Sequence, residues 1–365
     1  MEKKTDTSLE QNIRQRYFTA STHMSMGNLE REQSNYDAAL DAFEQARIIF
    51  ESIGKKSDAY RARLDIASVY ADLGKYDEAE TIYLTVIEMF QQLAQPKFEC
   101  VAIGNLGNIY KDQGMYAKAI RCYEHAIAFY KKINDKRNQT IFLGNMAIVY
   151  QQKGDLDTAI ALYEQAYLVH QEYEDLRGQA IVLGNLGTVY QQQNQYQLAL
   201  DYCLRSRKLF QQLSDKKNTA IFTGNCGEIF LHLKDEEKGV SFLEQAIAIC
   251  DEIFPIGAGV FRGTLGLFLA EKGAVQRALE VCIKGEKDVL SYPLEHAKFL
   301  CKKARILLIS DKQDEAQKYR KQAETIAIEL GVQKNSGLAV SILALREEME
   351  ISTQSFLAAL EKPSG

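Results

Sequence analysis

The sequence has little of several features that mark common protein classes. Its 365 residues include no tryptophan and only four prolines. Alanine, glutamate, glutamine, leucine and lysine dominate instead, and these residues favour helix. No apolar run is long enough to cross a bilayer, and the polar start MEKKTDTSLEQN lacks the pattern of a signal peptide. We therefore expect a helical, cytoplasmic protein that does not insert into a membrane.

Charge and cysteine usage exclude further classes. A formal net charge of -5 gives no electrostatic basis for direct binding of nucleic acid. The seven cysteines are odd in number and include no C-x-x-C, and the five histidines lack metal-ligand spacing. We expect reduced thiols in a helical core and no metal or other cofactor.

A segment of about forty residues recurs along the chain. The heptapeptides GNLGNIY, GNMAIVY, GNLGTVY and GNCGEIF mark four copies, each with two stripes of apolar residues at helical spacing around a polar break. The same register extends to weaker copies on both sides. We expect eight helix-turn-helix repeats over 17–334, at 20–59, 60–99, 100–139, 140–179, 180–219, 220–258, 259–296 and 297–334.

The pattern inside each copy resembles the tetratricopeptide repeat family over about residues 17–330. In the copy at 100–139 the matching residues are Leu106, Gly107, Tyr110, Gly114, Tyr116, Ala119, Tyr123 and Ala126. The forty-residue unit is similar to repeats of kinesin light chain, of the Pins/LGN adaptors and of bacterial regulators with such repeats. It is about six residues longer than the family's usual unit, so longer helices should fill the difference.

This resemblance implies an all-α fold, a right-handed superhelical α-solenoid with C-terminal capping helices. Small residues at Gly107, Ala147, Gly187 and Gly227 would let the two helices of a repeat approach closely. Stacked repeats share one core and need polar ends. We expect a polar N-terminal tail over 1–16, with the first helix starting near its end, and one or two capping helices and a tail over 335–365.

The sequence contains no recognisable catalytic motif, and we expect a protein that is not an enzyme. The glycine-rich stretch GAGVFRG at 257–263 has the wrong spacing for a dinucleotide site, and we expect an inter-repeat turn there. No Walker sequence, nucleophile elbow or H-E-x-x-H is present.

The asparagine of the heptapeptide is the leading candidate for a binding residue. Asn105, Asn145, Asn185 and Asn225 recur in register, where first helices of the related family face a concave groove. Asparagine is mildly unfavourable inside a helix, so its recurrence needs a reason. A ladder of amides can bind the backbone of an extended peptide. Alternatively, each asparagine bonds a neighbouring helix and stabilises the stack.

Three further columns flank these asparagines. Val101, Ile141, Ile181 and Ile221 precede them by four residues and could form an apolar wall or pack inside the stack, with packing slightly favoured. Gln152 and Gln192 align with His232 and could add surface contacts. The cations that precede the asparagines by eight residues could bind acidic groups of a ligand or be solvated at a turn; they are Lys97, Arg137, Arg177 and Lys217.

The leading hypothesis is a non-catalytic adaptor that binds an extended, possibly acidic peptide segment of a partner protein in the groove. One alternative is a regulatory sensor, whose repeats bind a small effector or signal peptide and control a transcription factor, protease or other enzyme. Another is a structural spacer. The oligomeric state is not defined by the sequence.

Overall fold

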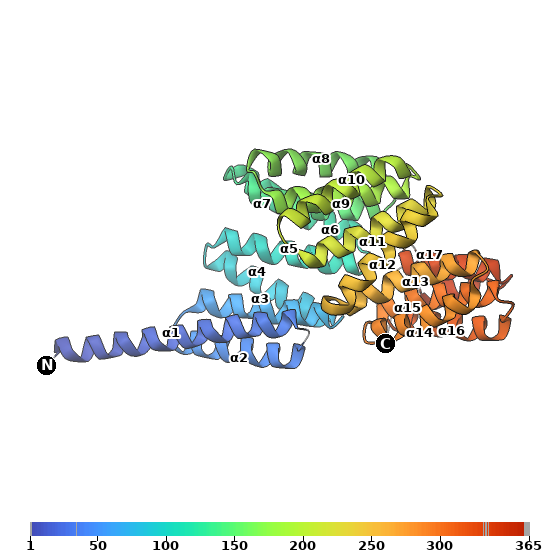
Figure 1. Cartoon of the computed structure of the whole chain (residues 1–365). Coiled ribbons are helices and arrows are strands. Elements are labelled where there is room, and N and C mark those ends of the chain that lie inside the picture. The colour runs from blue at the N-terminus through green and yellow to red at the C-terminus, as the bar shows by residue number, and fades with distance from the viewer. Residues whose placement is uncertain (1, 34, 331, 333, 335, 361–365) are drawn as a thin grey trace. The chain divides into compact units, whose positions relative to one another are not determined.

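The computed structural model of the chain describes residues 2–33, 35–330, 332, 334 and 336–360, with side chains from Glu10 onward. Within these residues the structure contains eighteen α-helices and no strand (Figure 1). None of the described helices combines the length and the apolar character that crossing a membrane requires. The all-α class expected from the sequence is confirmed.

Helices alternate between two roles. We call the first helix of each repeat its A helix and the second its B helix. The A helices are α1 (Glu2–Glu32), α3 (Lys56–Asp72), α5 (Pro96–Asp112), α7 (Lys136–Gln152), α9 (Leu176–Gln192), α11 (Lys216–His232), α13 (Pro255–Glu271) and α15 (Pro293–Ile309). The B helices are α2 (Tyr36–Ser52), α4 (Tyr76–Gln92), α6 (Tyr116–Lys132), α8 (Leu156–Glu172), α10 (Tyr196–Gln212), α12 (Glu236–Ile253), α14 (Val275–Val289) and α16 (Gln313–Glu329).

The forty-residue period follows from the helix lengths. In the central repeats each helix has 17 residues, as in α5 and α6. Short turns separate the helices, and each turn contains a residue with a left-handed backbone. Gly114 has this role with a φ of 71°, and Lys234 adopts a φ of 65° at the equivalent place. The turn geometry therefore persists in the later repeat without the glycine, and longer helices account for the extra length of the unit, as expected.

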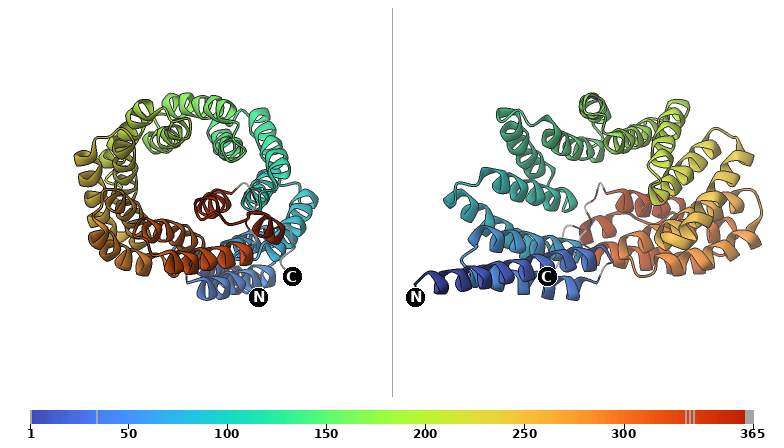
Figure 2. Two further views of the ribbon diagram at one scale, coloured as in Figure 1. Left: turned by 90° about the vertical axis from the view of Figure 1, so that its right-hand side faces the viewer. Right: turned by 60° about the vertical axis from the view of Figure 1, so that its left-hand side comes forward.

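The chain divides into two compact units, residues 1–135 (unit 1, α1 to α6) and 136–365 (unit 2, α7 to α18). Within each unit, the A and B helices of a repeat pack together, and each A helix also packs on the B helix of the preceding repeat. In unit 2 the A helices lie side by side on one face and the B helices on the opposite face (Figure 2).

Close approach of the two helices in a repeat depends on the expected small residues. A Cβ added to Gly107 would lie 2.8 Å from the Tyr123 ring, and one added to Gly187 would lie 2.5 Å from the Cys203 sulfur. Neither distance is compatible with a side chain at the glycine, so the backbone of the A helix packs directly on side chains of the B helix. The interpretation of these glycines is confirmed.

Two local expectations differ from the structure. The stretch 257–263 is not a turn but lies inside α13, where a Cβ on Gly259 would approach the Gly285 carbonyl oxygen to 2.7 Å. Its glycines therefore serve helix packing, and Pro255 starts the helix at a position where its missing N–H is harmless. At the N-terminus, α1 begins at Glu2 rather than after a polar tail, because residues 2–16 contain no helix breaker.

The end of the chain continues the helical stack. Two helices, α17 (Gly337–Glu348) and α18 (Gln354–Leu360), follow α16 within the expected capping region, and α17 packs on α15 and α16. Ser336 caps α17 by accepting a hydrogen bond from Ala339 N. Residues 335 and 361–365 of the predicted cap and tail lie outside the described residues.

Candidate functional site: the A-helix face

The asparagines occupy one position in every helix that carries them. Asn105, Asn145, Asn185 and Asn225 are each the tenth residue of a 17-residue A helix. All four side chains are half-buried. Asn105 belongs to unit 1, and the other three lie on α7, α9 and α11, successive A helices of unit 2.

The column extends further than the sequence analysis recognised. Thr264 is the tenth residue of α13 and Lys302 the tenth residue of α15. The Lys302 ammonium donates a hydrogen bond to the Thr264 hydroxyl oxygen over 2.8 Å. These rungs were missed because the last repeats are shorter, so a fixed spacing of forty loses the register. Alignment on the small residues at Gly227, Gly266 and Ala304 would have found both.

In unit 1 the asparagine has a structural partner. The Asn105 amide lies near the hydroxyl of Tyr83, a buried residue of the preceding B helix. Ser68 shares that hydroxyl at 2.7 Å. Burial raises the pKa of Tyr83 to about 12, so the phenol stays protonated and satisfied. At Asn105 the amide therefore has a polar neighbour in the preceding B helix, as the stacking interpretation expects.

Two asparagines of unit 2 lack such a partner. Asn145 has a partner within the protein. Asn185 and Asn225 make no side-chain hydrogen bond to any residue that the structure describes. The B helix before Asn225 carries Cys203 in place of the tyrosine of earlier repeats, and Cys203 lies in one buried cluster with Cys226. The amides of Asn185 and Asn225 therefore keep their hydrogen-bonding capacity for another molecule.

The glycines before Asn185 and Asn225 have a separate function. A Cβ on Gly184 would lie 2.1 Å from the ring of Phe222, and one on Gly224 would lie 2.2 Å from the ring of Phe261. In both cases the ring belongs to the next A helix. The glycine thus forms a socket that holds neighbouring A helices together, and this contact fixes the spacing of the asparagines along the face.

The apolar column is more exposed than simple packing predicts. Ile141 is 55% exposed and Ile181 is 46% exposed, while Val101 in unit 1 is 38% exposed. Ile221 is half-buried. In unit 2 the isoleucines lie one turn before the asparagines of the same helices. This arrangement agrees with an apolar wall beside the amides.

The cation column contributes contacts between repeats. Arg177 forms an ion pair with Asp215 of the next repeat at 2.9 Å, although 57% of its side chain stays exposed. Asp215 is also the N-cap of α11 and accepts from Asn218 N at 3.0 Å. Lys217 lies 4.3 Å from the ring centre of Phe254. Lys97 and Arg137 are exposed at the matching position of α5 and α7.

These contacts determine the charge state of the caps. Partial burial opposes ionisation of Asp215, but its hydrogen bonds from Asn218 and the charge of Arg177 outweigh that effect and lower its pKa. The pKa of Asp175 is lowered in the same way, against partial burial, by Gly178 N–H, His170 and the charge of Arg137. A cation near the start of a helix opposes the helix dipole. For Arg137 and Arg177, the attraction to the N-cap carboxylate of the next repeat compensates for this unfavourable interaction.

The glutamine column lies at the end of the A helices. Gln152 and Gln192 are exposed last residues of α7 and α9. Gln192 accepts a hydrogen bond from Gln151 over 3.2 Å, which links successive repeats. His232 occupies the same place in α11 and stacks on the Tyr196 ring at 4.6 Å. The column therefore borders the face beyond the asparagines.

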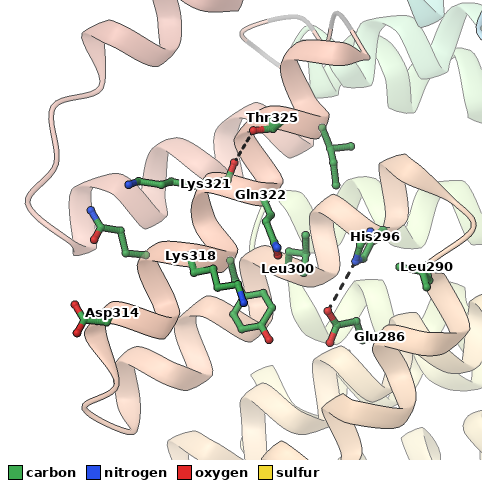
Figure 3. A pocket seen from close by; sticks show the side chains of 12 residues that line it. Glu286, Leu290, His296, Leu300, Asp314, Lys318, Lys321, Gln322 and Thr325 are labelled. Carbon is green, nitrogen blue, oxygen red and sulfur yellow. Dashed lines mark hydrogen bonds and ion pairs between the residues drawn. The ribbon is translucent and has the colours of Figure 1, made fainter.

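Unit 2 also contains a groove of about 860 Å³ among α14, α15 and α16 (Figure 3). His296 faces Glu286 there, with 3.9 Å between Nε2 and the nearer carboxylate oxygen. Burial lowers the pKa of His296. Lys303 pairs with the other Glu286 oxygen at 2.5 Å and lies 3.9 Å from the ring centre of Tyr319. The lining mixes both signs of charge and does not recur in other repeats.

Metal chemistry has no visible basis in the described part of the chain. No group of three or more His, Cys, Asp or Glu side chains there has an arrangement that could hold a metal ion. The seven cysteines are free thiols, and all except Cys122 are buried.

Comparison with known proteins settles the family. The tetratricopeptide repeat profile matches residues 18–92, 58–132, 98–172, 139–202 and 178–252, which together cover well over half of the chain. This protein belongs to the tetratricopeptide repeat family. A comparison with curated protein sequences finds no significant match.

Several solved structures have a similar fold. The apo form of the quorum sensor NprR from B. thuringiensis is 15% identical, with a TM-score of 0.59 over 85% of this chain and 88% of that one. A Rap protein complexed with Competence and Sporulation Factor is 16% identical, with a TM-score of 0.58 over 94% and 100%. The Rap conjugation gene regulator of plasmid pLS20, in complex with the Phr* peptide, is 16% identical, with a TM-score of 0.54 over 84% and 74%.

Proposed function

We propose that this tetratricopeptide repeat protein is a non-catalytic adaptor that binds an extended peptide segment of a partner protein along the A-helix face of unit 2. The observation that carries the proposal is the pair Asn185 and Asn225. Both amides are in register on neighbouring helices, half-buried, and without a hydrogen bond to a described residue. A carboxamide offers one acceptor and two donors, which match the N–H and C=O of a peptide group.

The flanking columns supply apolar surface and charge, which a ladder of amides lacks. Each hydrogen bond contributes about 0.5–1.5 kcal/mol net, and association entropy consumes much of that gain. Ile141 and Ile181 add exposed apolar surface next to the amides. Lys217 and the partly exposed Arg177 place positive charge at the border, which favours a ligand with acidic side chains. At the other end of the column, Thr264 and Lys302 offer polar groups beyond Asn225.

The similar structures support a peptide as the class of ligand. Two of them were solved in complex with Competence and Sporulation Factor or with the Phr* peptide. Their likeness to this chain concerns the fold, and the residues that would bind here are inferred from this chain's own contacts.

The test is a selection of binders from a displayed library of random twelve-residue peptides against the immobilised full chain. Selected peptides are then titrated against the wild type, against Asn185→Ala/Asn225→Ala and against a control, Gln165→Ala/Gln245→Ala. The control removes two exposed amides at matching positions of the B helices α8 and α12. We expect the asparagine variant to weaken binding about tenfold or more, since it removes hydrogen bonds of two rungs. Equal affinity for all three proteins would mean that the asparagines are architectural only.

A second candidate is a regulatory sensor, favoured by the likeness to a quorum sensor. In that function, binding of the peptide changes the conformation of the solenoid and thereby controls a partner protein. Small-angle scattering with and without a selected peptide distinguishes the two. A change in the radius of gyration at saturation supports the sensor, and an unchanged profile supports a passive adaptor.

A further inference from the structure

The first A helix exposes residues of a kind that the other repeats bury. On α1, Phe18 is 74% exposed, Met26 is 49% exposed and Leu29 is 53% exposed. Figure 1 shows α1 as the leading helix of unit 1. In the repeat register, the counterparts of Leu29 are almost completely buried, with exposed fractions of 0 or 1%: Val69, Ile109, Val149, Val189 and Ile229.

The structure shows what covers these counterparts. Ile66 and Val69, the counterparts of Met26 and Leu29 in α3, pack in one cluster with Ala39 and Phe43 of α2. In α11 the counterparts Cys226 and Ile229 pack in the same way on Ala199, Leu200 and Cys203 of α10. In each case the covering element is the B helix of the preceding repeat, and it contributes an alanine and a larger residue four positions later.

Phe18 follows the same rule. Its counterpart Phe98 at the start of α5 stacks on Phe90 of the preceding B helix, with ring centroids 5.4 Å apart. Arg61 covers the same Phe98 ring at 5.2 Å. Phe18, Met26 and Leu29, which we call the leading face, therefore form one side of an interface that this chain repeats internally.

We propose that the leading face of α1 binds an amphipathic helix of a partner protein that has the pattern of a B helix, with alanine followed four residues later by an aromatic residue. Such a helix would continue the interface between repeats by one more element. Within unit 1, α2 and α4 are each covered by the following A helix, and within unit 2 the same holds for α8, α10, α12 and α14, so these helices are not free in a folded second copy. This binding is independent of the peptide site proposed for unit 2.

The test uses the full chain and a synthetic helix with the sequence of α2, Tyr36–Ser52, labelled with fluorescein at its N-terminus. In this probe Gln45→Lys is joined by a lactam to Asp41, since both positions are exposed in the protein and lie one turn apart. The lactam is needed because an isolated helix of this length is marginal in water. Circular dichroism establishes that the probe is helical before the titration.

We expect saturable binding by fluorescence anisotropy, with a loss of affinity of about tenfold or more for Leu29→Ser, because the variant removes an exposed leucine that the bound helix would cover. The matched control is Ile48→Ser, which changes a residue that is 46% exposed on α2, outside the leading face. A probe carrying Phe43→Ser should bind as weakly as the Leu29→Ser protein binds the original probe.

Two results would overturn the proposal. The first is no binding of the helical probe at millimolar concentration, or equal binding to the wild type and Leu29→Ser. The second is a dimer of the free chain in sedimentation velocity that Leu29→Ser dissociates, since a second copy would then be the natural occupant of the leading face.

Discussion

Asp65 carries the charge whose removal should change the stability of unit 1 most clearly. It is the tenth residue of α3, the position that holds asparagine in the next four repeats. Burial raises its pKa from 3.8 to about 6, although Arg31 and Arg61 act in the opposite direction. Tyr83 lies close enough for the Asp65 charge to act on its phenol. The substitution Asp65→Asn keeps the shape and removes the charge.

The magnitude follows from the two protonation equilibria. A difference of about 2 pKa units corresponds to about 3 kcal/mol, at 1.36 kcal/mol per unit. Because the folded state binds the proton more tightly than the unfolded state, the ionised carboxylate of the wild type destabilises the fold above pH 6. Acidification relieves this penalty between about pH 6 and pH 4. Asp65→Asn should therefore be more stable by about 1–3 kcal/mol at pH 7.5, and the gain should vanish near pH 4.

The assay is native-state hydrogen exchange of α3 and α4 peptides, measured by mass spectrometry at pH 4, 5, 6 and 7.5 and corrected for intrinsic exchange rates. A local measurement is appropriate because stability in repeat proteins is distributed along the stack. The control is Asp41→Asn, an exposed carboxylate of α2. The reasoning is refuted if Asp65→Asn lowers protection at pH 7.5, or if its gain is the same at pH 4 and pH 7.5.

Three further outcomes are expected. In urea denaturation, Gly224→Ala should destabilise the chain by about 1–3 kcal/mol, because its Cβ would approach the Phe261 ring to 2.2 Å. The control Gly144→Ala meets nothing within 4 Å and should stabilise the chain by up to about 1 kcal/mol. Equal changes in the free energy of unfolding for the two variants would contradict the socket. The pKa values of Asp175 and Asp215 are lowered, so the contribution of these carboxylates to stability is present above about pH 4 and lost as pH falls below it. The loss of stability on acidification should therefore be shallower for Asp215→Asn than for the wild type. The six buried thiols should react with a disulfide reagent only on unfolding in urea, and fast labelling of several thiols in the native protein would show that unit cores open readily.

Much of the fold could be predicted because repetition multiplies a weak local signal. One copy of GNLGNIY is an ordinary helical stretch, but recurrence at forty residues fixes the register of small residues such as Gly107 and Gly187. The family and the all-α class followed from that register. The prediction failed at 257–263, where three glycines suggested a turn. Gly257 is packed against Phe254 and Cys250, Gly259 against α14 and Gly263 against Phe299, and the local sequence does not contain that information.

The candidate site was only partly predictable. Sequence placed the asparagines in one column, but the partner of each amide depends on the preceding B helix. The Asn105 amide lies near the Tyr83 hydroxyl, while Asn225 follows a repeat in which Cys203 replaces the tyrosine. The sequence also left open whether the residues in the columns beside the asparagines are paired within the protein. Arg177 is paired with Asp215 across a repeat boundary, which a count of charges along one helix cannot reveal.

The sequence by itself determined the repeating unit, the helices and the residues that share a helix face, because these depend on contacts over at most one period. Only the tertiary structure decided which members of a column are already satisfied. Among the described residues it showed no hydrogen bond to the amides of Asn185 and Asn225, and a half-exposed Leu29 on α1 where Val69 and Ile229 are buried. The physical reason is that equivalent residues have equivalent chemistry but not equivalent neighbours, and a neighbour's side chain, or its absence at the end of a stack, decides whether a group is available to bind.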